Sequence, residues 1–173
     1  ASVGELEVAL RAGIDPRQIV MHGNNKSVKD LERAVEVGVG RIVIDSLIEI
    51  ERLNSVAASA GIVQQVLLRL TVGVEAHTHE AISTAHEDQK FGLSTASGMA
   101  MAAVDNVLEC DALSLAGLHS HIGSQIFDAT GFELATHRVV DFAVQIKERH
   151  GISVSELDVG GGMGIAYIDG DDP

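Results

Sequence analysis

The feature that most constrains the fold is a regular alternation of short apolar runs with longer segments of helical spacing. The apolar runs contain few polar positions, which is typical of parallel strands covered on both faces. Because parallel strands need a crossover connection, usually a helix, the alternation predicts repeated βα units around a parallel sheet. The expected strands are 18–23, 41–46, 65–70, 113–121 and 156–162, and the expected helices are 3–12, 27–38, 46–60, 95–108 and 129–149.

Capping signals mark where several of these helices begin and end. A hydroxyl residue three positions before a carboxylate can form a capping box, in which both side chains satisfy free backbone N–H groups. This spacing occurs at Ser2–Glu5, Ser46–Glu49 and Thr130–Glu133, and in a weaker form at Ser27–Asp30. Glycines stand where three helices are expected to end, at Gly13, Gly38 and Gly61.

Two parallel architectures compete, an open doubly wound sheet and a (β/α)8 TIM barrel. No G-x-G-x-x-G motif follows the first expected strand, which weakens the open, dinucleotide-binding alternative. Polar residues instead follow several strands at their carboxyl ends, where a barrel builds its central site. We therefore expect a TIM barrel of which this chain holds about five of the eight βα units. The segment 72–94 is expected to be a long loop at the active-site face.

Composition narrows the compartment and the class of partner. A net charge of -13 and a sequence pI near 4.8 argue against nucleic acid and against an anionic membrane surface. No apolar run approaches the roughly 18 residues of a membrane span. A single cysteine, Cys110, excludes an internal disulfide and fits a reducing compartment. We expect an acidic cytoplasmic protein.

Three consecutive glycines, Gly160, Gly161 and Gly162, follow the last expected strand. Glycine lets the backbone approach a ligand closely and point N–H groups at an anion. Phosphate binding and a tightly packed turn are about equally compatible with the triplet. Ser124, which follows Gly123, offers a hydroxyl and a backbone N–H to a phosphate.

His119 and His121 are two residues apart in an expected strand, so their side chains project to the same face. Some barrel hydrolases bind zinc in this way, and Asp45 and Asp158 would be the further ligands. Alternatively, one histidine is buried and hydrogen-bonded while the other is functional. The segment 75–90 is also dense in histidine and carboxylate side chains, a density more typical of a solvated face than of a metal site.

Six blocks of sequence together resemble the diaminopimelate decarboxylase family in its actinobacterial form. They are collinear and cover essentially the whole chain: ASVGEL (1–6), HGNNKS (22–27), EAHTHE (75–80), HEDQKFG (86–92), GLHSHIGSQIFD (117–128) and LDVGGGMGIAY (157–167). The resemblance implies an alanine-racemase-like barrel that binds pyridoxal 5'-phosphate, followed by a second, β-rich domain. It also implies decarboxylation of meso-2,6-diaminopimelate to L-lysine by a homodimer.

The resemblance implies roles for individual residues. His121 matches the histidine that lies against the pyridine ring of the cofactor, and His119 is provisionally left with a structural role. The residues matched to the cofactor phosphate are Ser124, Gly160, Gly161 and Gly162. No metal is implied.

The lysine that forms the Schiff base in the family has no match in this sequence. It lies on the first barrel strand, which would precede Ala1, whereas the lysines present here lie in other blocks, at Lys26, Lys29, Lys90 and Lys147. His86 and Lys90 belong to a block that lies close to the cofactor in relatives. The resemblance therefore implies that 1–173 is a central part of the barrel, without its first strand and without the β-rich domain. We expect this chain alone to have no decarboxylase activity.

Three alternatives stay open. Another pyridoxal-phosphate decarboxylase of the same fold, acting on ornithine, arginine or carboxynorspermidine, would share the histidine, serine and glycine positions. A zinc-dependent barrel hydrolase would use His119 and His121 together. A non-catalytic module would bind the cofactor without turning over a substrate.

Overall fold

The structure is a computed structural model that describes residues 2–74 and 91–166, and the expected residues His86 and Lys90 lie outside these ranges. The helices are α1 (Val3–Arg11), α2 (Val28–Val37), α3 (Leu47–Ala60), α4 (Met99–Leu108) and α5 (Thr130–His150), with a short 3-10 turn at Pro16–Gln18. The strands are β1 (Val20–Met21), β2 (Arg41–Ile44), β3 (Gln64–Thr71), β4 (Leu93–Ser94), β5 (Leu113–Ser120) and β6 (Glu156–Asp158). Every expected helix and strand is present, although most ends differ by a few residues.

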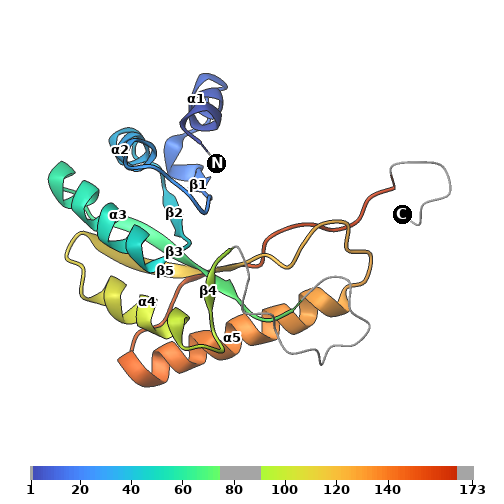
Figure 1. Ribbon diagram of the computed structural model, residues 1–173. Coiled ribbons are helices and arrows are strands. Elements are labelled where there is room, and N and C mark those ends of the chain that lie inside the picture. The colour runs from blue at the N-terminus through green and yellow to red at the C-terminus, as the bar shows by residue number, and fades with distance from the viewer. Residues whose placement is uncertain (1, 75–90, 167–173) are drawn as a thin grey trace.

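The order of the strands decides between the two architectures. All pairs are parallel and the order is β1-β2-β3-β5-β6, so each crossover moves to the next strand in the same direction. Because parallel crossovers are right-handed, this order places the helices on one face of the sheet, as in a barrel. An open doubly wound sheet would reverse direction at a switch point. Figure 1 shows the helices following one another along one side of the sheet, which confirms the barrel class.

An ion pair across the inner face shows that the sheet is curved. Arg41 at the start of β2 donates hydrogen bonds through Nε to both carboxylate oxygens of Glu156 in β6, at 3.0 and 2.9 Å. In a flat sheet these strands would lie three strand spacings, about 14 Å, apart. A direct pair between them therefore requires a concave inner face, and the chain is part of a (β/α)8 barrel.

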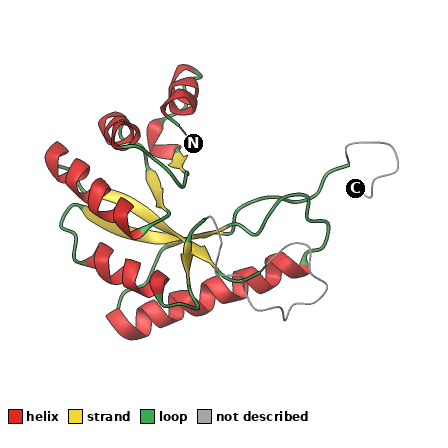
Figure 2. Ribbon diagram, in the orientation of Figure 1, coloured by secondary structure: helices red, strands yellow, loops and turns green. Residues whose placement is uncertain are grey.

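The strand β4 corrects the expectation that 72–94 is an uninterrupted loop. Leu93 and Ser94 pair with the last two residues of β3, Leu70 and Thr71 (Figure 2). The pairing of β2 with β3 ends earlier, at Leu68, while β5 continues along the other edge of β3 to Leu70. β4 therefore takes the edge of β3 that β2 leaves open. A strand of two residues has no periodicity of its own, so the sequence pattern could not reveal it.

The capping expectations were half right. Ser2–Glu5 and Ser27–Asp30 form complete capping boxes, and α2 and α3 end in left-handed glycines, Gly38 and Gly61. No side-chain cap forms at Ser46, because the Glu49 carboxylate turns inward to accept the backbone N–H of Asp45 at 3.0 Å.

The start of α5 also differs from the expected capping box. The carboxylate of Asp128 accepts hydrogen bonds from the N–H and the hydroxyl of Thr130, at 2.9 and 2.7 Å. The helix therefore starts with its first N–H satisfied from Asp128, and Thr130 is its first residue rather than its cap. The predicted Thr130–Glu133 capping box was wrong because Asp128, two residues before Thr130, is the better hydrogen-bond acceptor.

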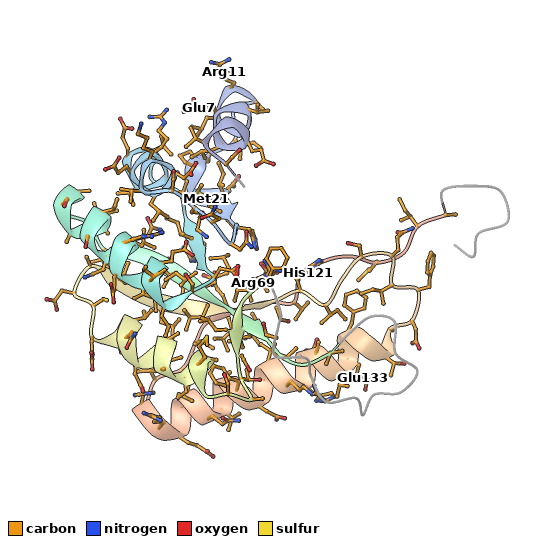
Figure 3. All side chains as sticks on the ribbon, in the orientation of Figure 1. Glu7, Arg11, Met21, Arg69, His121 and Glu133 are labelled. Atoms are coloured by element: carbon orange, nitrogen blue, oxygen red, sulfur yellow. The ribbon has the colours of Figure 1, made fainter. Side chains whose placement is uncertain are left out.

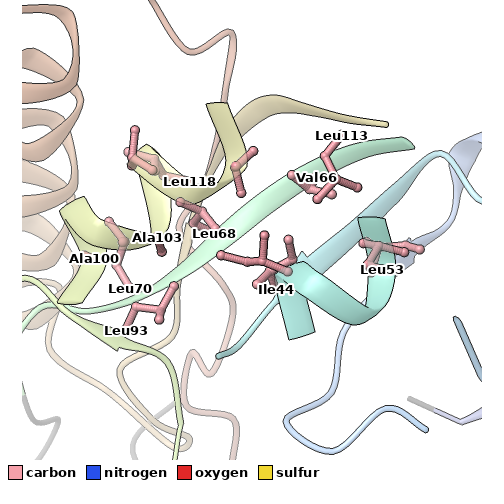
Figure 4. Packing of buried hydrophobic residues seen from close by; sticks show 14 of the residues in the cluster. Ile44, Leu53, Val66, Leu68, Leu70, Leu93, Ala100, Ala103, Leu113 and Leu118 are labelled. Carbon is pink, nitrogen blue, oxygen red and sulfur yellow. The ribbon is translucent and has the colours of Figure 1, made fainter. Parts of the chain in front are cut away.

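The core fills the space between the sheet and the helices. Ile44, Leu68 and Leu118 on three strands are fully buried against Leu53 and Ala103 on α3 and α4 (Figure 4). The opposite face carries only a small buried cluster, Val43, Leu67 and Ala116. No helix in the described ranges combines the length and the apolar content that crossing a membrane requires.

Candidate functional site

Polar side chains continue the inner face beyond its small apolar cluster. Strand pairing aligns Arg69 with His119 and His119 with Asp158, and Asp45 directly follows the last residue of β2. His22 likewise follows the last residue of β1. Because all strands are parallel, these residues gather at one end of the sheet, the carboxyl end, where barrels place their sites.

A pocket of about 320 Å³ lies at this end of the sheet, within the size range of small-molecule sites. Figure 3 shows Arg69 and His121 close together at this end of the strands. The lining residues come from β3, β5 and β6 and from the segments that follow β1, β5 and β6: His22, Arg69, His119, His121, Asp158, Gly160 and Gly161.

Asp158 joins the two sides of the pocket. Its Oδ2 atom lies 3.2 Å from Nδ1 of His119 and 3.7 Å from Nε2 of His22. Its Oδ1 atom accepts the backbone N–H of Gly160 at 2.9 Å. The two imidazole rings meet edge to face, with their centroids 4.7 Å apart. One carboxylate therefore positions both histidines and the first turn of the glycine segment.

Burial keeps both of these imidazoles neutral. Desolvation lowers the pKa of His22 to about 4, with a further lowering from His119 that outweighs the attraction of Asp158. Desolvation also lowers the pKa of His119 below its ordinary value, against the opposing effect of Asp158. Both rings are therefore neutral near pH 7.

The three positions of the glycine triplet differ in the space that they leave for a side chain. A Cβ on Gly162, whose φ is +104°, would lie 1.9 Å from the carbonyl oxygen of Gly123. A Cβ on Gly160, whose φ is +75°, would lie 2.7 Å from the carbonyl oxygen of Ser120. A Cβ on Gly161 would meet nothing within 4 Å. Tight packing therefore explains Gly160 and Gly162, while Gly161 leaves space that a ligand can enter.

Backbone hydrogen bonds place the segment after β5 beside the segment after β6. Ile126 N donates to Gly162 O and Gly164 N donates to Ile126 O, both at 2.9 Å. As a result Ser124 lies against Gly162, with its Cα 3.3 Å from where a Gly162 Cβ would stand. Ser124 does not itself line the pocket in the part of the chain that the structure describes.

The geometry changes the interpretation of the two expected histidines. His119 is buried, as a structural histidine would be, but it also lines the pocket. The one group of three potential metal ligands found within residues 2–74 and 91–166 is His22, His119 and Asp158. It includes neither His121 nor Asp45, so the zinc set expected from the H-x-H spacing is not assembled.

Neither His22 nor Arg69 received an individual role from the sequence. Both line the pocket. The signal that could have found them is their position, because each stands at the carboxyl end of an expected strand. Asp45 lies deeper, where its Oδ2 atom is 3.9 Å from Nη1 of Arg69 and its Oδ1 atom accepts the N–H of Gly92.

A buried ion pair supports the strand ends behind the pocket. Nζ of Lys26 lies 2.6 Å from Oε1 of Glu49 and donates to the carbonyl oxygens of Val43, at 2.7 Å, and Gly23. Burial raises the pKa of Glu49, against the opposing effect of Lys26. The Lys26 side chain is fully buried, so it cannot reach a ligand in the pocket.

Comparisons with known proteins identify the family of the chain. A family model described as "Pyridoxal-dependent decarboxylase, pyridoxal binding domain" matches residues 1–173. The diaminopimelate decarboxylase of Mycobacterium tuberculosis H37Rv is 62% identical over 174 residues, which cover 98% of this chain and 39% of that protein. The chain therefore spans about 39% of the length of this relative.

Solved structures show the same fold. A crystal structure of diaminopimelate decarboxylase from M. jannaschii in complex with L-lysine has a TM-score of 0.90 and 35% identity, covering 99% of this chain and 39% of the other. Lysine/ornithine decarboxylase from Vibrio vulnificus has a TM-score of 0.78 and 24% identity, covering 96% of this chain and 40% of the other, and shows the fold alone. This chain belongs to the family of pyridoxal-dependent decarboxylases and matches their pyridoxal-binding domain.

Proposed function

We propose that this chain binds pyridoxal 5'-phosphate in the pocket at the carboxyl ends of the strands. The observation that carries the proposal is the pairing of the segment after β5 with the segment after β6, which brings His121, Ser124 and the glycine triplet to one place. The pocket has room for a small molecule beside Gly161. The donor set also fits the cofactor, since it combines backbone N–H groups, a hydroxyl and an imidazole.

The phosphate is assigned to the glycine side of the pocket. Gly161 and Gly162 offer backbone N–H groups and Ser124 offers its hydroxyl, which are the donors that phosphate-binding loops use. The N–H of Gly160 already donates to Asp158, so Gly160 contributes the shape of the turn and part of the lining. Substitution of any one donor should weaken phosphate binding without abolishing it.

The ring is assigned to the histidine side. His121 is exposed and lines the pocket, so the face of its imidazole is available to pack against the pyridine ring. Arg69 lines the pocket as well, with a side chain only 14% exposed. His121 and Arg69 would hold the ring in one orientation. The contact between His119 and Asp158 fixes the pocket lining behind the ring.

When bound, the cofactor takes up the electron pair released as the bond between Cα and the carboxylate breaks. The residues of this chain bind and orient the cofactor. Among the described residues no lysine lines the pocket, since Lys26 is buried against Glu49 and Lys29 and Lys147 lie on exposed helix positions. We therefore expect that none of Lys26, Lys29 and Lys147 forms the imine with the cofactor.

For the whole protein we propose decarboxylation of meso-2,6-diaminopimelate to L-lysine. The 62% identity to the Mycobacterium tuberculosis enzyme supports this substrate over ornithine, arginine or carboxynorspermidine. A solved relative in complex with L-lysine supports the same product. A β-rich second domain, a homodimer and a cytoplasmic location are part of this proposal.

A chimera tests the activity. Residues 1–173 replace the matching segment of the Mycobacterium tuberculosis enzyme, and L-lysine formation from meso-diaminopimelate is measured with ornithine and arginine as competing substrates. We expect activity within about tenfold of the parent enzyme, because the barrel walls are equivalent. A folded chimera that loads the cofactor but forms no lysine would contradict the proposed substrate.

Cofactor binding is tested on the chain itself by equilibrium dialysis with pyridoxal 5'-phosphate. Loss of a hydrogen bond to a charged group costs about 1.5–3 kcal/mol, so Ser124→Ala should weaken binding roughly 10- to 100-fold. Ser59→Ala removes an exposed hydroxyl on α3 and is the matched control, expected to leave the affinity unchanged. Equal affinities for the two variants would remove Ser124 from the phosphate site.

A further inference from the structure

We propose that His22, His119 and Asp158 form a binding site for a divalent transition metal such as Zn²⁺, and that the bound ion excludes the cofactor from the pocket. The metal site goes beyond the proposed function and does not depend on it. Only the exclusion of the cofactor rests on pyridoxal-phosphate binding in the same pocket.

The spacing of the three ligand atoms carries the proposal. One ligand atom from each residue lies within 4.8 Å of the other two. In a tetrahedral zinc site with bonds near 2.0–2.1 Å, ligand atoms are about 3.4 Å apart. Asp158 Oδ2 is at 3.7 Å from Nε2 of His22 and at 3.2 Å from Nδ1 of His119, a nitrogen that also lies 3.2 Å from the carbonyl oxygen of Asp158. Coordination through this nitrogen would replace its hydrogen bond to Asp158. The separation of the two imidazole nitrogens would have to shorten most, by no more than about 1.4 Å.

The chemistry of the ligands selects the type of ion. Two imidazole nitrogens and one carboxylate oxygen suit zinc and its neighbours, whereas Mg²⁺ and Ca²⁺ prefer oxygen ligands alone. Three protein ligands leave the fourth position open toward the pocket, where water can complete the coordination.

Neighbouring charges permit a cation here. Arg69 lines the pocket and would repel an ion, but Asp45 stands 3.9 Å from its guanidinium and offsets that charge. The carboxylate of Asp158 adds a negative charge among the ligands themselves, in a chain whose net charge is -13. A hydrogen bond from Gly160 N to Oδ1 of Asp158 holds that carboxylate in place, as hydrogen bonds to metal-binding carboxylates do.

The ion and the cofactor compete for the same space. His121, Gly160 and Gly161, which we assign to the cofactor site, line the same pocket as the three metal ligands. A hydrated ion on His22 and His119 would occupy the volume in front of them. Zn²⁺ should therefore slow or block cofactor loading, and a chelator should restore it.

Cobalt titration tests the site, because Co²⁺ replaces Zn²⁺ and has visible absorption bands. We expect one Co²⁺ per chain without cofactor, displaced by Zn²⁺. His22→Ala and Asp158→Asn should each weaken Co²⁺ binding at least tenfold. His137→Ala is the matched control, since it removes an exposed imidazole 3.9 Å from the Glu133 carboxylate on α5, and should change the affinity less than twofold.

A further variant separates this site from the cofactor site. His121→Ala should leave Co²⁺ binding unchanged and weaken pyridoxal-phosphate binding. Loss of Co²⁺ binding in His121→Ala, or no loss in a folded His22→Ala variant, would overturn the site. Circular dichroism checks the fold, and His22 is the first choice for substitution because its side chain is 38% exposed.

The outcomes are distinguishable from failure of the proposed function. If Co²⁺ binds through His22 but pyridoxal phosphate does not bind, the proposed cofactor fails and the metal site stands. If both bind at once without affecting one another, the exclusion is wrong. Absence of Co²⁺ bands at millimolar concentration with the wild-type chain would overturn the metal site itself.

Discussion

Asp158 shows how a single side chain can organise both halves of a pocket. One oxygen contacts His119 and His22, and the other accepts the N–H of Gly160. The imidazoles and the glycine turn are therefore not independent, although about forty residues separate His119 from Asp158 along the chain. A change at Asp158 should disturb both the metal ligands and the phosphate side of the pocket.

The glycine triplet yields a prediction at the residue scale. Gly162→Ala should destabilise the fold by about 2–5 kcal/mol, since a left-handed backbone costs about 1–2 kcal/mol and overpacking costs about 1–3 kcal/mol more. Gly161→Ala should cost about 1 kcal/mol or less, because no atom lies within 4 Å of the added Cβ. Urea unfolding of both variants measures the difference. Equal losses would show that packing against Gly123 does not explain Gly162.

At the scale of elements, the buried Lys26–Glu49 pair links the loop after β1 to the start of α3. Lys26→Met should lower the free energy of unfolding by about 3–5 kcal/mol, because it leaves a buried carboxylate without its partner. The double variant Lys26→Met/Glu49→Leu should recover part of this loss. Arg17→Met, which breaks an exposed pair with Asp15, should cost less than about 1 kcal/mol in the same urea titration.

The Arg41–Glu156 pair links β2 to β6 and makes stability depend on pH. The side-chain hydrogen bond with Arg41 lowers the pKa of the Glu156 carboxyl below its ordinary value of 4.5. The stabilisation that the pair gives to the fold is therefore present above pH 4.5, and it is lost as the pH falls through the folded-state pKa of Glu156.

Urea midpoints of the wild type and of Arg41→Met, measured from pH 3 to pH 7, test this dependence. The difference between the two should be largest near neutral pH and should shrink below about pH 4. A constant difference across that range would mean that Arg41 acts through packing of its aliphatic part and not through the carboxylate.

At the scale of the whole molecule, ligand binding should stabilise the fold. Pyridoxal 5'-phosphate at 100 times its Kd should add about 2.7 kcal/mol to the free energy of unfolding and raise Tm accordingly. Pyridoxal without the phosphate should raise Tm much less, because the glycine segment and Ser124 would have no anion to bind. Differential scanning calorimetry with both compounds measures this, and equal shifts would argue against a phosphate site.

Much of the fold was predictable because its signals are local. Strand and helix identity follows from runs of apolar residues and from helical spacing, and the stops at Gly38 and Gly61 follow from left-handed caps. The strand β4 was missed because only its pairing with β3 defines it. The capping box at Ser46 was mispredicted because the Glu49 carboxylate binds the backbone N–H of Asp45 and the ammonium group of Lys26. The box at Thr130 was mispredicted because Asp128 supplies the competing acceptor.

The candidate site was predictable in its parts but not in its assembly. The parallel βα class and the position of the polar residues at the carboxyl ends of the strands follow from the sequence pattern alone. The family resemblance of the blocks around His121, Ser124 and Gly160–Gly162 is likewise visible in the sequence. The grouping of His22, rather than His121, with His119 and Asp158 is visible only in the folded chain. The physical reason is that local patterns specify which face a side chain takes, whereas strand order, register and sheet curvature specify which distant side chains meet there.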